Sequence, residues 1–167
     1  MVFRDVNGTP HFNIGGEAKP PELAGKSRVE IIWCYPKARK SMGGEMILFV
    51  EDEAQQLKYM RRLLEGEGYR VLGAQDGVEA VALHRRYSNE IDLVVLDLKL
   101  PKLSGWDAFQ EMKREDPRLK ALVASAYVTP EVKSAIESGE LLGLFVKPYS
   151  VDLFLARISD VIRKPAT

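Results

Sequence analysis

The sequence is poor in the residues that form disulfides and soft metal sites. Its 167 residues include one cysteine, Cys34, and two histidines, His11 and His84. A single cysteine excludes an internal disulfide and a cysteine-based zinc cage, and two histidines exclude a histidine-rich metal site. The sequence also has no apolar run long enough to span a bilayer and no secretory signal, so we expect a cytoplasmic protein without a membrane segment.

Net charge is lacking as well. The 24 basic and 24 acidic residues cancel, so the chain has no overall electrostatic footprint for nucleic acid, and we expect no nucleic-acid partner. The composition, 46% hydrophobic and 29% charged, fits one globular domain with some additional sequence.

From residue 46 onward, short apolar runs alternate with amphipathic stretches, which is typical of repeated βαβ units around a parallel sheet. We predict strands over 46–50, 69–73, 91–96, 121–124 and 141–146, and helices over 53–65, 78–87, 106–115, 130–137 and 151–163. Asp76 and Thr129 are typical N-caps before the second and fourth of these helices.

Residues 1–45 do not follow this rhythm and are predicted to be an extension of a domain over 46–167. Residues 2–6 and 9–14 flank Asn7-Gly8 and predict a hairpin with a type I′ turn, whose second strand Pro10 confines to an edge. A third strand is predicted over 28–35, followed by a basic linker. Because an isolated hairpin is marginal in water, we expect these strands to pack on the main domain or on a second copy, forming a homodimer.

A carboxylate follows the third predicted strand of the main domain. Asp97 comes directly after the apolar run 91–96, a place where charge is rarely found without a purpose. Ligands of open parallel sheets bind at the carboxyl ends of the strands. Asp97 therefore indicates where the functional site lies.

Other polar residues end neighbouring strands. Glu51 and Asp52 follow the first strand and would converge with Asp97 if these strands were adjacent. Carboxylates this close repel unless a cation lies between them, and oxygen ligands with room for water favour Mg²⁺. The last strand ends at Lys147 and the fourth at Ser125, a cation and a hydroxyl. Such a set is suited to phosphoryl transfer.

The order of these motifs over residues 46–163 resembles the receiver domain of the two-component response-regulator family. The resemblance implies an α/β, flavodoxin-like (βα)5 fold, a doubly wound parallel sheet with strand order 2-1-3-4-5. It implies that Asp97 is the phosphoacceptor, Ser125 the hydroxyl that contacts the phosphoryl group and Lys147 the lysine characteristic of the family. The phosphoryl group would come from a phosphohistidine of a sensor histidine kinase or a histidine phosphotransfer protein.

The resemblance also implies a Mg²⁺ cofactor. Its ligands would be Glu51, Asp52, Asp97 and the backbone carbonyl of Lys99. A protein of this kind catalyses its own phosphorylation and dephosphorylation and acts as a switch rather than as a metabolic enzyme. No helix-turn-helix pattern follows the last predicted helix, so we expect a stand-alone regulator that signals by protein contact, or the receiver of a hybrid kinase.

Two other functions remain open at this point. One is a non-phosphorylated receiver-like module that binds a partner through its N-terminal strands. The weaker one is a metal-dependent phosphohydrolase with an aspartyl nucleophile, which is disfavoured because no second carboxylate lies two residues after Asp97.

Three further positions carry expectations of their own. Receivers usually have Tyr or Phe three residues before the lysine, where this chain has Leu144, and Phe145 should face the other side of the sheet. We hypothesise that Lys99 and Tyr127, each two residues after a site residue, screen the acyl phosphate from water. His84, in a predicted amphipathic helix, is expected to be solvated.

Overall fold

The computed structural model describes residues 2–4, 10–12 and 43–163, and the chain divides into two compact units, Met1–Trp33 and Cys34–Thr167. In the first unit, β1 (Val2–Arg4) pairs with β2 (Pro10–Phe12) in an antiparallel sheet. These strands lie within the two ranges predicted for the hairpin and are shorter than predicted. Its turn, the third N-terminal strand and most of the linker lie outside the described residues, so the packing of the extension and the homodimer stay predictions.

The second unit contains a five-stranded parallel sheet with the order β4-β3-β5-β6-β7. This is the predicted order 2-1-3-4-5 of a flavodoxin-like fold. Its strands are β3 (Met46–Val50), β4 (Arg70–Ala74), β5 (Ile91–Leu96), β6 (Ala121–Ser125) and β7 (Leu144–Val146). The last strand starts later than predicted because Leu141 donates its amide to the carbonyl of Ala135 in the preceding helix, 2.9 Å away, rather than to another strand.

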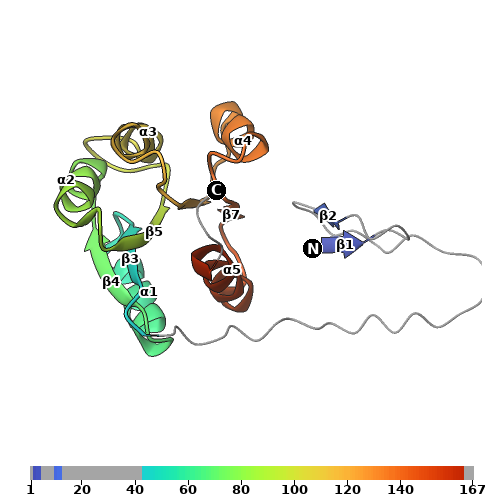
Figure 1. Cartoon of the computed structure of the whole chain (residues 1–167), viewed down its shortest axis with the longest axis horizontal. Coiled ribbons are helices and arrows are strands. Elements are labelled where there is room, and N and C mark those ends of the chain that lie inside the picture. The colour runs from blue at the N-terminus through green and yellow to red at the C-terminus, as the bar shows by residue number, and fades with distance from the viewer. Residues whose placement is uncertain (1, 5–9, 13–42, 164–167) are drawn as a thin grey trace, which may run out of the picture. The chain divides into compact units, whose positions relative to one another are not determined.

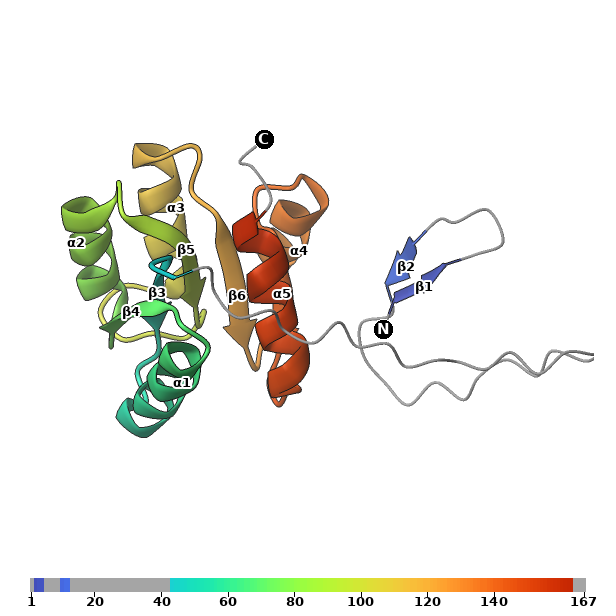
Figure 2. The same cartoon turned by 60° about the horizontal axis from the view of Figure 1, so that its bottom comes forward.

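Five helices cover the two faces of this sheet. They are α1 (Ala54–Gly66), α2 (Gly77–Tyr87), α3 (Gly105–Glu115), α4 (Pro130–Glu137) and α5 (Val151–Arg163). Figures 1 and 2 show α2, α3 and α4 on one face and α1 and α5 on the other. The side chains of Asp76 and Thr129 accept hydrogen bonds from backbone amides of α2 and α4, which confirms both predicted N-caps. Among the described helices, none has the length and apolar character needed to cross a membrane.

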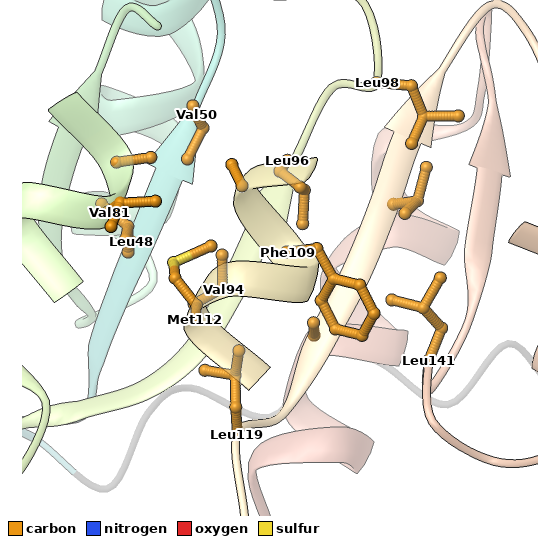
Figure 3. Close-up of a cluster of buried hydrophobic side chains, with 14 of the residues drawn as sticks. Leu48, Val50, Val81, Val94, Leu96, Leu98, Phe109, Met112, Leu119 and Leu141 are labelled. Carbon is orange, nitrogen blue, oxygen red and sulfur yellow. The ribbon is translucent and has the colours of Figure 1, made fainter. Parts of the chain in front are cut away.

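The core forms two layers because β3 and β5 are buried on both faces. Leu48, Val50, Val94 and Leu96 point toward α2, α3 and α4 and belong to the cluster in Figure 3. The residues that alternate with them belong to the cluster beneath α1 and α5: Ile47, Phe49, Leu93, Val95. Each such side chain stabilises the fold by about 1.5–3 kcal/mol when it is fully buried. This two-sided core fixes the strand ends that carry the site.

The interpretation of His84 as a solvated residue is wrong. Its side chain lies on the inner face of α2 and the residue is only 2% exposed. Both ring nitrogens are buried without a hydrogen-bond partner in the described part of the chain. The helical pattern permitted either face, and the packing of α2 on the sheet decided between them.

Candidate functional site at the carboxyl edge of the sheet

Glu51 and Asp97 lie side by side because the strands that carry them are neighbours in register. Val50, the last residue of β3, is paired with Leu96, the last residue of β5. The ladder continues one residue further, since the amide of Asp97 donates to the carbonyl of Val50 at 3.1 Å. The next residue of each strand is therefore held at the same edge of the sheet.

Lys147 links the two carboxylates. Its Nζ lies 2.6 Å from Oε2 of Glu51 and 2.7 Å from Oδ2 of Asp97. The three side chains are 19%, 4% and 12% exposed, in the order Lys147, Glu51, Asp97. Because such charges are strongly desolvated, the shared ammonium is what makes their burial tolerable.

The second oxygen of Asp97 is also hydrogen-bonded. Ser125, which is fully buried at the end of β6, donates its Oγ proton to Oδ1 of Asp97 at 2.7 Å. The backbone amide of Lys99 donates to the same oxygen at 3.0 Å. The structure thus brings Glu51, Ser125 and Lys147 together around Asp97, as the strand order predicts.

The pKa values of these groups show how the charges are balanced. Burial alone would raise the pKa of Asp97, but hydrogen bonds from Lys147, the Lys99 amide and Ser125 outweigh it and hold the pKa below its usual value. Burial would lower the pKa of Lys147, but the hydrogen bonds with Asp97 and Glu51 outweigh it and raise the pKa. Asp97 and Lys147 are therefore both charged at neutral pH.

Glu51 differs from Asp97. Its burial raises its pKa, and the opposing effect of Lys147 does not fully compensate. Gln56, on the first turns of α1, donates its Nε2 proton to Oε2 of Glu51 at 2.8 Å and supports the carboxylate. Sequence reasoning missed Gln56, although its place in the first helix after Glu51 was a usable signal.

The other two predicted metal ligands, Asp52 and Lys99, are exposed residues beside this cluster. As the side chains stand, no three of the described His, Cys, Asp and Glu residues form a metal-holding group. The donor chemistry nevertheless fits Mg²⁺: Glu51 and Asp97 already share one cation between their oxygens, and Asp52 adds an oxygen that faces solvent. We therefore keep these residues as candidate ligands.

Leu144 and Phe145 face opposite sides of the sheet, as predicted. Leu144 packs on the core cluster of α2, α3 and α4, and Phe145 on that of α1 and α5. Phe145 contacts Phe154 and Tyr149, with ring centroids 5.0 and 5.5 Å away. The aromatic side chains near the lysine therefore lie on the α5 side of β7.

Lys99 and Tyr127, each two residues after a site residue, contact each other. The Nζ of Lys99 lies 5.8 Å from the centroid of the Tyr127 ring, within the range of a cation–π contact. Tyr127 is 63% exposed, and its amide hydrogen-bonds to Oγ of Ser125 at 3.4 Å. The screening of an acyl phosphate by this pair stays a hypothesis.

Comparison with known proteins gives a consistent result. The model of the response regulator receiver domain family matches residues 47–159. The chemotaxis protein CheY of Treponema pallidum is 32% identical over 131 residues, which are 77% of this chain and 90% of that protein. The chain also spans 15–50% of the length of longer curated relatives, which are a sensor kinase and transcriptional regulators.

Solved structures agree with the sequence matches. The non-phosphorylated HemR receiver domain from Leptospira biflexa is 30% identical with a TM-score of 0.67, covering 72% of this chain and 96% of that one. The CheX–CheY complex with BeF3 and Mg²⁺ from Borrelia burgdorferi is 25% identical with a TM-score of 0.66, covering 72% and 90%.

Proposed function

The chain belongs to the family of response regulator receiver domains and is a phosphoacceptor switch of two-component signalling; from this premise we propose that Asp97 is the residue that accepts the phosphoryl group. The observation that carries the proposal is the pair of contacts on its carboxylate. Lys147 binds one oxygen and Ser125 the other. No comparison favours the alternative of a non-phosphorylated interaction module.

The donor we propose is a phosphohistidine on a sensor histidine kinase or a histidine phosphotransfer protein. An oxygen of Asp97 attacks the phosphorus, the new P–O bond forms an acyl phosphate, and the P–N bond breaks with its electron pair returning to the imidazole. Lys147 is near enough to move from the carboxylate to an oxygen of the phosphoryl group, and Ser125 can donate its proton to another. Water later hydrolyses the acyl phosphate, which resets the switch.

The metal ligands we propose are Glu51, Asp52, Asp97 and the backbone carbonyl of Lys99. Bound Mg²⁺ would neutralise negative charge on the phosphoryl oxygens during transfer. Glu51 and Asp97 directly follow the adjacent strands β3 and β5, so the fold itself holds their two carboxylates close together. A CheY relative was crystallised with BeF3 and Mg²⁺, which supports the assignment for this chain.

The test is phosphorylation of the full chain with acetyl phosphate and Mg²⁺, followed by intact mass measurement. We expect a mass increase of one phosphoryl group that is lost in Asp97→Ala and Asp97→Asn. The matched control is Asp92→Asn, since Asp92 lies near the opposite end of β5 and accepts a hydrogen bond from the Met46 amide. The absence of any mass increase with acetyl phosphate or a phosphorylated kinase would support the interaction module instead.

A further inference from the structure

The loop between β5 and α3, residues 97–104, contains an unusual backbone conformation. Lys102 has a φ of 63°, and it is the one non-glycine residue with positive φ in the described ranges. This left-handed region disfavours residues with a Cβ, so a lysine there must be held by surrounding contacts. The feature lies in the segment that also carries Lys99, whose backbone touches Asp97.

Two contacts hold Lys102: the Leu103 amide donates to the carbonyl of Pro101 at 2.7 Å across it, and its side chain forms an ion pair with Asp76. The Nζ of Lys102 lies 2.5 Å from Oδ2 of Asp76, whose side chain is 8% exposed. The other oxygen of Asp76 caps α2 by accepting the amide of Glu79 at 2.8 Å. The hydrogen bond to α2 thus orients the Asp76 side chain, and its other oxygen is available to bind Lys102.

A backbone contact next to this ion pair brings the loop against α2. At Gly77, the first residue of α2, an added Cβ would lie 2.2 Å from the carbonyl oxygen of Leu103. Two consecutive loop residues, Lys102 and Leu103, thus rest on two consecutive residues at the start of α2. These two contacts attach the loop to the start of α2.

The same loop is tied to the site at its other end. The Lys99 amide donates to Oδ1 of Asp97 at 3.0 Å. At Gly105, which closes the loop, an added Cβ would lie 1.8 Å from the backbone oxygen of Asp97, so no larger residue fits there. The loop is short and in contact at both ends, so its position at Lys102 bears directly on the backbone of Lys99.

We propose that Lys102 is a positioning residue: through its ion pair with Asp76 it fixes the loop 97–104 so that the backbone of Lys99 meets Asp97 and its carbonyl is placed for Mg²⁺. The part of this proposal that concerns Mg²⁺ rests on the proposed function. The placement of the Lys99 amide on Asp97 does not.

Two variants separate positioning from folding. Lys102→Gly removes the ion pair and at the same time tolerates the left-handed backbone, so the chain should remain folded. Asp76→Asn keeps an N-cap for α2 and removes the charge that binds Lys102. Lys102→Arg, which keeps the charge, is the conservative control, and Lys133→Ala on the exposed face of α4 is the matched control for losing a lysine.

The first measurement is Mg²⁺ affinity of the unphosphorylated protein by calorimetric titration. We expect Lys102→Gly to weaken Mg²⁺ binding about 3–10-fold, somewhat less than the loss typical of groups that directly support a metal ligand. The sign is diagnostic, because removing a positive charge near the site without moving the loop would strengthen binding. Affinity that is unchanged or higher in Lys102→Gly would overturn the proposal.

The second measurement needs no metal. Amide hydrogen exchange at Lys99 should be faster in Lys102→Gly and in Asp76→Asn than in the wild type, and close to the wild type in Lys102→Arg and Lys133→Ala. Unchanged exchange in the first two variants would refute the positioning role even if Asp97 proved not to be phosphorylated. Conversely, if the wild-type protein were not phosphorylated, the proposed function would be refuted, but the exchange result would still hold.

Discussion

At the carboxyl edge of the sheet, Lys147 is largely buried and donates hydrogen bonds to the carboxylates of Glu51 and Asp97. Near the amino edge, by contrast, His84 is buried with both ring nitrogens unpartnered in the described part of the chain. In the first group, Asp97 and Lys147 stay charged because they are hydrogen-bonded to each other. The pKa of His84 is lowered, chiefly because burial disfavours the imidazolium. The same core thus favours the ionised forms of a hydrogen-bonded pair at one edge and the neutral form of an unpartnered histidine at the other.

The surroundings of His84 make the contrast sharper. It borders a cleft of about 500 Å³ that also involves Arg85, Asp92, Asp116 and Arg118. Arg85 is engaged by Glu111 and Glu115 on α3, at 2.6 and 2.5 Å. The carboxylates of Asp116 and Glu115 favour a protonated His84, but burial outweighs them and, together with the charge of Arg85, keeps the pKa of His84 low.

Removing the shared cation should have the largest effect on stability. We expect Lys147→Met to lower the free energy of unfolding at pH 7 by about 3 kcal/mol, because it leaves Glu51 and Asp97 facing each other without a counter-charge. The measurement is urea denaturation, with Lys133→Met as the control. Because the pKa of Asp97 is lowered in the folded wild type, Asp97 stabilises the fold when the pH is above its ordinary pKa of 3.8, and this stabilisation is lost as the pH falls further. The difference in unfolding free energy between wild type and variant should therefore narrow in acid. Equal stability at pH 7 would show that the three groups are not coupled.

The exposed candidate ligand should behave in the opposite way. Asp52→Asn is expected to weaken Mg²⁺ binding at least about tenfold, because its carboxylate is free to serve the metal. Its exposure means that the free energy of unfolding should change by no more than about 0.5 kcal/mol. Calorimetric titration and denaturation measure the two quantities. The control is Glu53→Gln, since we expect Glu53 to support α1, and an Asp52 variant with wild-type Mg²⁺ affinity would remove it from the ligand set.

The burial of His84 should make the stability of the protein depend on pH. Because its pKa is lowered in the folded protein, the unfolded chain takes up a proton first as the pH falls below the ordinary value of 6.5, and the wild type loses stability there. His84→Leu should lack this loss and be more stable at pH 8 by about 1 kcal/mol, since it removes two unsatisfied nitrogens. Denaturation at pH 8 and 5.5 tests both points, with His11→Leu as the control. An identical pH slope in His84→Leu would contradict the description of a buried neutral histidine.

The smallest effect concerns the contact between Lys99 and Tyr127. Lys99→Asn and Tyr127→Ala should each speed dephosphorylation of the acyl phosphate about 2–5-fold, the equivalent of losing one exposed cation–π contact. The rate is followed by release of inorganic phosphate from phosphorylated protein. If both variants release phosphate at the wild-type rate, the two side chains do not screen the acyl phosphate.

Much of the fold and of the candidate site could be predicted because the signals are local or depend only on order along the chain. Apolar runs located β3 and β5 to the residue, and the proline after Thr129 located the start of α4. Once the sheet was taken as parallel, residues that end successive strands had to share one edge. Asp97, Ser125 and Lys147 could therefore be grouped without any knowledge of their side-chain positions.

Other features depended on which face packs inward and which distant groups meet. Nothing in the helical pattern around His84 distinguished burial from exposure. The ion pair of Lys102 with Asp76 joins a loop and a helix start 26 positions apart, and that of Lys147 with Glu51 spans 96 positions. Such pairs form only after the core has fixed the strand ends, so they are set by packing rather than by local sequence.

The sequence by itself determined the order of strands and helices, the family and the residues that gather at the carboxyl edge, because these follow from periodicity and from the order of motifs. The tertiary structure alone decided the shared lysine between Glu51 and Asp97, the unpartnered burial of His84 and the left-handed Lys102 held by Asp76. The physical reason is that a hydrogen bond or an ion pair depends on distances of a few ångströms, and only the packed core sets those distances.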